Sequence, residues 1–316
     1  MKTALIIGCN GQDGRLLYES LMTKGYEVTG VERPASQPST GNDWRIPMDI
    51  GDPQAVSELL KRLRPDEIYY LAAYHHSSEN IPLQGDLDLF NRSFQVHVQS
   101  LIHFLEGMRL FSTKSRLFYA ASSHVFGNAV ITPQDELTPF NPKCIYGLTK
   151  TAGIHACRFY RDRHRLFVST GILYNHESRY RKPIFVTRKI ILGAINIKKG
   201  LQDSLVLGDL SAEVDWGYAP DFIEAFQKIL NVAAPDDFVV ATGRKHSVQE
   251  FVELTFRYIG LDWKQYVQED RSIISKSGAT LIGDPRKLEH MTGWKPSVDF
   301  HEMIRLLLVQ EGMHVE

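Results

Sequence analysis

Short apolar runs recur along the first half of the chain, separated by longer segments with apolar residues at helical spacing. The apolar runs predict buried strands at residues 3–7, 26–31, 65–73, 116–121 and 166–173. The intervening segments predict helices directly after residue 14 and at residues 53–63, 91–110 and 146–163. Strands that alternate with helices in this order build a parallel sheet with helices on both faces. The pattern therefore predicts an α/β fold with a doubly wound parallel sheet.

Three glycines separate the first apolar run from the helix that follows it. Gly8, Gly11 and Gly14 have the spacing G-x-x-G-x-x-G, a variant typical of short-chain dehydrogenases. A buried strand, a glycine turn and an amphipathic helix form the Rossmann-type unit that holds a dinucleotide, with its pyrophosphate at the helix N-terminus. We therefore expect these glycines, together with Gln12 and Asp13 between them, to bind the cofactor.

The end of the second predicted strand bears on the choice of cofactor. Glu32 can accept hydrogen bonds from both ribose hydroxyls of NAD and would repel the 2′-phosphate of NADP. Arg33 beside it would pair with that phosphate, so the sequence allows NAD or NADP, and Glu32 favours NAD. Asp49 is expected to contact the edge of the adenine ring, and Ala72 and Ala73 are small enough for the cofactor to pass closely. Their neighbours Ile50 and Leu71 are expected to contact the cofactor as well.

A tyrosine and a lysine four residues apart carry the main catalytic signal. Within a helix, Tyr146 and Lys150 lie on one face, so the ammonium can lower the tyrosine pKa from about 10 towards neutrality. Tyr146 would then exchange a proton with a substrate hydroxyl or carbonyl while a nicotinamide exchanges hydride. Ser122 follows the predicted strand at residues 116–121, where its hydroxyl can bond the same substrate oxygen. Tyr-x-x-x-Lys alone is usually a solvated helix face, but with the glycine turn and the serine it indicates an enzyme.

Composition narrows the class of protein further. The 316 residues, 43% of them hydrophobic and 23% charged, suffice for one large core or two modest ones. A formal net charge of -1 argues against nucleic acid and anionic membranes as partners, and no uninterrupted run of roughly 20 apolar residues predicts a membrane span. The cysteines, Cys9, Cys144 and Cys157, are too few and too scattered for a disulfide framework or a zinc site, so we expect no metal. A reduced, cytoplasmic protein is the simplest interpretation.

The alternation of strands and helices becomes irregular and polar beyond Tyr174. We therefore expect residues 1–173 to form the dinucleotide-binding domain and residues 174–316 to form mainly a smaller substrate-binding portion. A strand-like run at residues 238–243 is expected to return to the sheet of the first domain. Residues 34–42, rich in proline, serine and glycine, are expected to form an exposed loop.

Short stretches spread in order over nearly the whole chain match one known family. They are Gly11-Gln-Asp-Gly14, Pro65-Asp-Glu-Ile-Tyr69, Tyr146-x-x-x-Lys150, Gly171-Ile-Leu-Tyr-Asn-His-Glu-Ser178, Phe185-Val-Thr-Arg-Lys-Ile190, Asp215-Trp-Gly-Tyr-Ala219, Asp237-Phe-Val-Val-Ala-Thr-Gly243 and Gly283-Asp-Pro285. With them the sequence resembles the extended short-chain dehydrogenase/reductases that modify nucleotide sugars, and most closely the GDP-mannose 4,6-dehydratase family.

The resemblance implies a catalytic cycle. In the resembled dehydratases, the tyrosine, the lysine and the cofactor oxidise C4 of the hexose, a glutamate removes the C5 proton, water leaves from C6, and hydride returns to C6. The family's Ser-Thr-Ser-Glu motif corresponds here to residues 121–124, so Ser122 replaces the threonine and His124 the glutamate. A histidine with a pKa of about 6.5 can act as the base, and the alternative for His124 is packing under the cofactor cleft. The resemblance also implies substrate contacts from His76, Ser123, Asn175, Glu177, Val186 and Lys189.

Two departures from the family pattern concern the diphosphate of the substrate. The family carries an arginine just before Asp-Trp-Gly, where this chain has Val214. A second arginine, in an Arg-Pro-x-Glu segment before Gly-Asp-Pro, is missing from residues 272–279. Each charge-assisted contact contributes roughly 1.5 to 3 kcal/mol, so the loss of two is not conservative. Either Arg181, Arg271 or Lys276 replaces them, or the ligand is not an ordinary GDP-hexose.

Three functions fit these observations. The leading hypothesis is a nucleotide-sugar 4,6-dehydratase with a histidine base and a GDP-linked substrate. A 4-epimerase or 4-keto reductase needs the serine, the tyrosine, the lysine and the cofactor, but no base at C5. The third is a catalytically inactive cofactor-binding protein, against which the intact Tyr146 and Lys150 argue. In the resembled family, helices corresponding to residues 91–110 and 146–163 form a two-fold interface and the loop at 34–42 can reach a neighbour's cofactor, which implies a homodimer or homotetramer.

Overall fold

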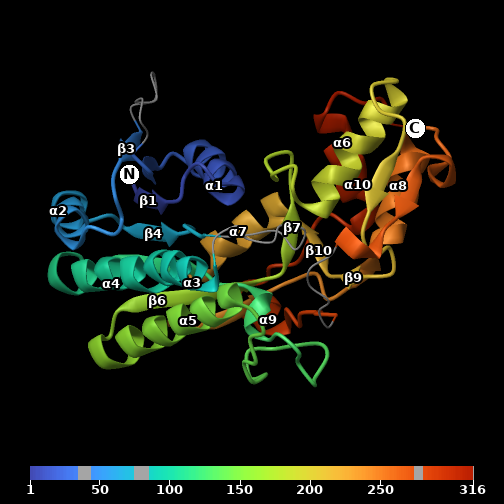
Figure 1. Cartoon of the computed structure of the whole chain (residues 1–316). Helices are drawn as coiled ribbons and strands as arrows, with labels where there is room; N and C mark the ends of the chain where they lie inside the picture. Colours follow the sequence, from blue (N-terminus) through green and yellow to red (C-terminus); the bar gives the residue numbers. More distant parts are fainter. Residues whose placement is uncertain (35–43, 75–84, 274–279, 316) are drawn as a thin grey trace.

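The computed structural model describes residues 1–34, 44–74, 85–273 and 280–315. Its centre is a seven-stranded parallel sheet in the order β11-β6-β5-β4-β1-β2-β3 (Figure 1). The strands of this sheet are β1 (Thr3–Ile7), β2 (Glu27–Glu32), β3 (Arg45–Pro47), β4 (Glu67–Tyr70), β5 (Arg116–Ala120), β6 (Phe167–Leu173) and β11 (Asp237–Val240). The α/β fold predicted from the alternation of strands and helices is confirmed.

Helices cover both faces of the sheet, which makes it doubly wound. One face is covered by α2 (Pro53–Leu63), α4 (Ser100–Phe111) and α5 (Ile145–His164), which share a core with Ile68 and Tyr70 of β4. The other face is covered by α1 (Gln12–Thr23), α7 (Ala219–Ile229) and α9 (Arg286–Thr292), in a core that contains Tyr69. Successive residues of β4 enter opposite cores because side chains alternate along a strand.

Two predicted elements differ from the observed ones. The helix predicted at residues 91–110 begins earlier and consists of α3 (Asp86–Phe94), the π-helical turn η1 (Gln95–Gln99) and α4. Apolar spacing did not reveal the turn, because one wider turn leaves the helical pattern on either side intact. The strand predicted at residues 65–73 contains only β4. Leu71, Ala72 and Ala73 therefore lie beyond the carboxyl end of the strand, the edge where parallel sheets bind ligands.

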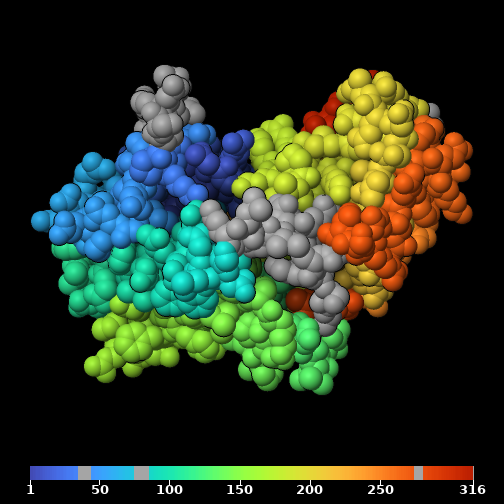
Figure 2. Space-filling model, viewed as in Figure 1, coloured from blue at the N-terminus to red at the C-terminus, as the bar shows by residue number. Residues whose placement is uncertain are grey.

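The C-terminal half contributes to the sheet and also forms a core of its own. β11 pairs in parallel with β6, so the strand-like run at residues 238–243 does return to the sheet. A further core forms around α6 (Val186–Lys198), α8 (Val248–Tyr258) and α10 (Phe300–Gln310), at the right in Figures 1 and 2. Short strands pair beside it: β7 (Asn175–Glu177) with β10 (Trp216–Tyr218), β8 (Leu205–Leu207) with β13 (Val267–Glu269), and β9 (Glu213–Val214) with β12 (His246–Ser247).

The division of the chain at residue 173 into a cofactor-binding and a substrate-binding part stays a prediction. Three elements beyond that residue, α7, α9 and β11, lie with the central sheet. Most of the loop predicted at residues 34–42 and the candidate substrate contact His76 lie outside the described residues. Within the described ranges, no helix combines the length and the apolarity that crossing a membrane requires.

Candidate active site

The predicted tyrosine and lysine lie together near the start of α5. Cys144 precedes this helix and caps it, because its sulfur accepts a hydrogen bond from the backbone N–H of Gly147 (3.4 Å). Lys150 is almost fully buried, and its Nζ donates to the carbonyl oxygen of Ala120 at the end of β5 (2.7 Å). The same Nζ lies 5.8 Å from the ring centroid of Tyr146. The spacing of four residues thus places both side chains on one face of α5, beside the end of β5.

The pKa values of this pair differ from the expectation based on sequence. Burial raises the pKa of the Tyr146 phenol above its usual range, although the nearby Arg181 guanidinium and a hydrogen bond with Ser122 lower it in part. Burial also lowers the pKa of the Lys150 ammonium to about 7. The prediction that Lys150 brings the pKa of Tyr146 towards neutrality is therefore wrong for this structure, because the desolvation of both groups dominates.

The segment after β5 brings a serine and a histidine to the tyrosine. The Ser122 hydroxyl hydrogen-bonds the Tyr146 phenol and accepts from the backbone N–H of His124 (3.3 Å), at the start of the short 3-10 helix η2 (Ser123–Val125). The side chain of His124 is exposed, and its ring stands edge-on to that of Tyr146 with 5.9 Å between the centroids. This exposure does not fit a histidine that is merely packed under the cleft, the alternative considered for His124.

The glycine turn forms a close-packed cradle at the start of α1. Gly8 has a φ of 91°, and a Cβ there would lie 2.8 Å from the backbone nitrogen of Ala72. A Cβ on Gly14 would lie 2.6 Å from the carbonyl oxygen of Gly8, so this glycine lets α1 pack onto the end of β1. Gly11 precedes α1 without a side chain to cap the first N–H groups of the helix. These donors and the positive end of the helix dipole fit the pyrophosphate of a dinucleotide.

The side chains of Gln12 and Asp13 bind another part of the protein. Gln12 Nε2 donates to the carbonyl oxygen of His176 (3.0 Å), and its Oε1 accepts from Ser178 Oγ (2.9 Å). Asp13 Oδ1 lies 3.1 Å from His176 Nε2. Burial disfavours both charges, but their attraction outweighs it, so the Asp13 pKa lies below its usual value and the His176 pKa above. These side chains join α1 to the segment at β7, and the predicted contact of Gln12 and Asp13 with a cofactor stays a prediction.

Glu32 lies at the end of β2, as predicted, and its carboxylate has polar neighbours. Glu32 Oε2 accepts from Asn10 Nδ2 (2.8 Å) and lies 3.9 Å from Arg45 Nη1. The Arg45 guanidinium lies over the ring of Trp44, 4.8 Å from its centroid. Arg33, the alternative partner for a 2′-phosphate, is exposed. The negative charge of Glu32 is therefore held in place, whereas Arg33 extends towards solvent.

The remaining predicted cofactor residues lie near the same edge of the sheet. Asp49 is exposed, and its Oδ1 accepts from the backbone N–H of Gly51 (2.9 Å). Ile50 packs against the core under α2 and α4, and Leu71 packs against the core on the other face. Ala73 is exposed beyond the end of β4. Their contacts with a cofactor stay predictions.

The residues assigned to the substrate by resemblance differ in accessibility. Half-buried positions are occupied by Asn175, Val186 and Lys189, whereas Ser123 is buried. Glu177 is only 2% exposed, and its Oε2 accepts from Thr187 Oγ1 (2.6 Å). Direct contact of Glu177 with a substrate does not fit this burial. The carboxylate instead faces Arg181, whose Nε lies 3.4 Å from the same oxygen.

Two arginines, Arg181 and Arg271, were named as substitutes for the missing diphosphate contacts. Of these two, only the charge of Arg181 acts on Tyr146. Its guanidinium stacks on the ring of Phe185, 3.8 Å from the centroid, and lowers the pKa of Tyr146. Arg271 is exposed, and its Nε donates to Glu269 (2.8 Å). Lys276 lies outside the described residues. Of the three cations named as substitutes, Arg181 is the one whose charge acts on Tyr146 within the described residues.

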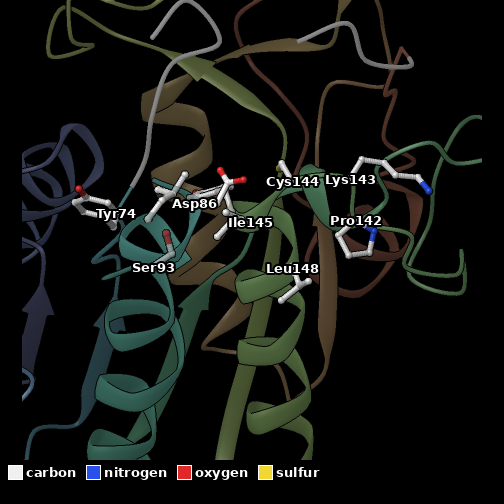
Figure 3. A pocket seen from close by; sticks show the side chains of 10 residues that line it. Tyr74, Asp86, Ser93, Pro142, Lys143, Cys144, Ile145 and Leu148 are labelled. Atoms are coloured by element: carbon white, nitrogen blue, oxygen red, sulfur yellow. The ribbon is translucent and has the colours of Figure 1, made fainter. Parts of the chain in front are cut away.

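Apart from Tyr146 itself, the cavity beside this tyrosine is built from residues that no sequence motif marks. It has a volume of about 460 Å³ and lies between the first turns of α3 and α5 (Figure 3). Its lining is Tyr74, Asp86, Leu89, Ser93, Pro142, Lys143, Cys144, Ile145, Tyr146 and Leu148. His97 in η1 was also missed, although its ring stands edge-on to that of Tyr146 at 5.2 Å. These residues come together from segments far apart in the chain, so no signal in the sequence distinguishes them.

Known proteins resemble the chain over almost its whole length. The model of the GDP-mannose 4,6 dehydratase family matches residues 5–307. GDP-mannose 4,6 dehydratase 2 of Arabidopsis thaliana is 37% identical over 333 residues, which cover 98% of this chain and 87% of that protein. Among solved structures, dTDP-glucose 4,6-dehydratase of Bacillus anthracis in complex with NAD superimposes with a TM-score of 0.83 at 15% identity, covering 99% of this chain and 97% of that one. RMD from Pseudomonas aeruginosa, complexed with NADPH, has a TM-score of 0.80 at 20% identity and 98% coverage of both chains. The chain therefore belongs to the GDP-mannose 4,6-dehydratase family.

Proposed function

We propose that the protein is a nucleotide-sugar 4,6-dehydratase that uses a nicotinamide dinucleotide. The observation that carries the proposal is the cluster of Ser122, His124, Tyr146 and Lys150, built from the end of β5 and the start of α5. This cluster occurs in a chain of the GDP-mannose 4,6-dehydratase family. The glycine cradle at the start of α1 supports a dinucleotide as the cofactor.

Each residue of the cluster has a role that its position supports. The nicotinamide ring, when bound, supplies hydride acceptance at C4 of the hexose and hydride return at C6. Tyr146 takes the proton of the C4 hydroxyl in its phenolate form, which burial disfavours and the Arg181 charge and the Ser122 hydrogen bond favour, and Ser122 holds the same substrate oxygen by a hydrogen bond. His124, exposed beside the phenol, takes the C5 proton, which the ketone at C4 has made acidic, and gives it to the C6 hydroxyl, which leaves as water. Lys150, fixed by the carbonyl of Ala120, supports the position of Tyr146.

The proposal is tested by mass spectrometry of GDP-mannose incubated with the purified protein and NAD or NADP. Loss of the mass of one water is the expected result. An unchanged sugar mass combined with a changed configuration at C4 would instead show an epimerase. A gain of two hydrogens with added NADH would show a reductase. Recovery of unaltered GDP-mannose and of other nucleotide sugars under all conditions would contradict an enzymatic role.

A 4-epimerase or 4-keto reductase is the second candidate, and the identity of one residue favours it. The base at C5 belongs to dehydration alone, and this is where the chain has His124 in place of the family's glutamate. The groups needed for hydride exchange at C4 are Ser122, Tyr146 and Lys150, and these lie together. Chemistry limited to C4 would therefore use the site as it stands.

We propose NAD as the cofactor, because the charge of Glu32 lies at the end of β2. We expect wild-type protein to bind NAD more tightly than NADP, and Glu32→Gln to reduce this preference by about tenfold or more, since like charges in contact cost several kcal/mol. Calorimetric titration with both dinucleotides measures the preference. Glu27→Gln, at the exposed opposite end of β2, is the matched control and should leave it unchanged. Equal affinity of the wild type for NAD and NADP would contradict the proposal.

We also propose that the protein is a homodimer or a larger homo-oligomer. Large apolar side chains are exposed on α4 and α5, namely Leu110, Leu148 and Phe159. Exposed apolar residues on neighbouring helices are typical of an interface between subunits. Light scattering at micromolar concentration is expected to give at least twice the chain mass of 36.0 kDa. A mass equal to that of one chain would contradict an oligomer.

A further inference from the structure

His97 lies in the π-helical turn between α3 and α4, and its side chain is completely buried. A π turn inside a long helix is energetically unfavourable and occurs frequently at functional sites. Here the turn packs against α5, the helix that carries Tyr146 and Lys150. The carbonyl oxygen of His97 also accepts a hydrogen bond from the Tyr119 hydroxyl of β5 (3.3 Å). The turn therefore joins β5, an inner strand of the sheet, to the catalytic helix.

Both ring nitrogens of His97 have partners, and these partners lie on different walls of the site. The backbone N–H of Tyr74 donates to His97 Nε2 (2.9 Å), so this nitrogen carries no proton. His97 Nδ1 consequently carries the proton and faces Thr149 Oγ1 (2.8 Å). The hydroxyl of Thr149 lies within hydrogen-bonding distance of the carbonyl oxygens of Ile145 (2.9 Å) and Tyr146 (3.1 Å). One neutral imidazole thus bridges the segment after β4 and the first turn of α5.

The ring of His97 also contacts the phenol ring directly. It stands at 90° to the ring of Tyr146 with 5.2 Å between the centroids, an edge-to-face arrangement that stabilises one orientation of both rings. His124 makes a second perpendicular contact with the same ring at 5.9 Å. Tyr146 is therefore held between a buried histidine and an exposed one. The two histidines therefore have different roles, because the side chain of His124 is accessible to a substrate and that of His97 is not.

On the basis of the proposed function, we propose that His97 is a positioning residue for the reaction at Tyr146. Through Tyr74, His97 holds the segment that follows β4 and borders the glycine cradle. Through Thr149, it holds α5, the helix that carries Tyr146. The ring of His97 is completely buried, so we assign it no direct contact with the substrate. His97 affects the reaction by fixing the position and orientation of the Tyr146 phenol. A displacement of such a group by about 1 Å can reduce the rate by about 10²-fold.

Three variants of His97 separate this role from general packing. His97→Ala removes both hydrogen bonds and the ring contact. His97→Gln can keep an acceptor for the Tyr74 N–H, and His97→Asn can keep a donor for Thr149. His103→Asn is the matched control, because this histidine of α4 bonds the carbonyl of Ile50 (3.3 Å) and has no contact with Tyr146 among the described residues. The measurements are kcat and KM for the nucleotide sugar and Kd for the dinucleotide.

We expect His97→Ala to lower kcat by about 10²-fold while KM and the dinucleotide Kd stay close to the wild-type values. His97→Gln and His97→Asn should each recover part of the rate, and His103→Asn should match the wild type. An unchanged kcat in His97→Ala would overturn the proposal. So would equal losses of rate and dinucleotide affinity that neither polar variant recovers. If His97→Ala does not fold, the Gln and Asn variants decide by the same comparison with His103→Asn.

A second measurement needs no turnover and separates this proposal from the proposed function. The ultraviolet difference spectrum of each protein against its Tyr146→Phe counterpart, recorded at neutral pH, reports the surroundings of this one tyrosine. The His97 ring stands edge-on to the phenol ring at 5.2 Å, so its removal admits water and should shift the tyrosine absorption to shorter wavelength. His103→Asn should leave the spectrum unchanged. An unaltered Tyr146 spectrum in all His97 variants would overturn the positioning role even if the wild type converts no nucleotide sugar.

Discussion

Replacement of Tyr146 by phenylalanine is expected to abolish turnover while leaving dinucleotide binding almost intact. The substitution removes one oxygen and retains the ring that packs between His97 and His124. The phenol is the group at this position that can take and return the proton of the C4 hydroxyl. General acid–base contributions are typically about 10²–10⁴-fold, so we expect kcat to fall by about 10³-fold. Steady-state kinetics and calorimetric titration with the dinucleotide measure the two quantities separately.

Tyr160→Phe is the matched control for this experiment. Tyr160 lies near the other end of α5, where its hydroxyl donates to Glu106 Oε1 (2.6 Å). Loss of this hydroxyl removes one hydrogen bond from the same helix without touching the catalytic cluster, so kcat should stay close to the wild-type value. Wild-type rates in Tyr146→Phe would remove the phenol from the mechanism.

Substitution of His124 is expected to separate dehydration from hydride exchange at C4. His124→Gln should lose dehydration, because the amide cannot accept the C5 proton, but hydride should still pass to and from C4. The effect is again expected to be about 10²–10⁴-fold in the elimination rate. The side chain of His124 is exposed, so its replacement should not disturb the fold. Isotope exchange at C4 and loss of water, followed by mass spectrometry, measure the two steps.

The pH dependence gives a second test of the same residue. A base must be unprotonated, so the elimination rate should rise with pH through the pKa of His124. With His124→Glu, the rise should move down by roughly two pH units, as the ordinary pKa values of the two side chains differ by about that much. His155→Gln, an exposed histidine further along α5, should keep the wild-type profile. Dehydration by His124→Gln at the wild-type rate would show that His124 is not the base, and the absence of dehydration in both wild type and His124→Glu would favour the epimerase or reductase.

Much of the fold was predictable from sequence because its determinants are local. A buried parallel strand is a short apolar run, and five such runs predicted strands of the central sheet near their observed positions. The glycine turn was recognisable because Gly8 needs a positive φ and Gly14 leaves no room for a Cβ. The pairing of Tyr146 with Lys150 follows from the helical repeat alone, since residues four apart share a face.

Other features depended on the tertiary structure because they arise from residues far apart in the chain. The pKa of Tyr146 is raised by the surroundings that bury it, and a spacing of four residues cannot show that burial outweighs a nearby cation. Gln12 reaches His176, 164 positions away, and His97 reaches Thr149, 52 positions away. Local sequence determines which segments become strands and helices and which residues share a helical face. The packing of those segments decides which polar side chains are buried, which partners they meet, and which histidine beside Tyr146 is open to a substrate.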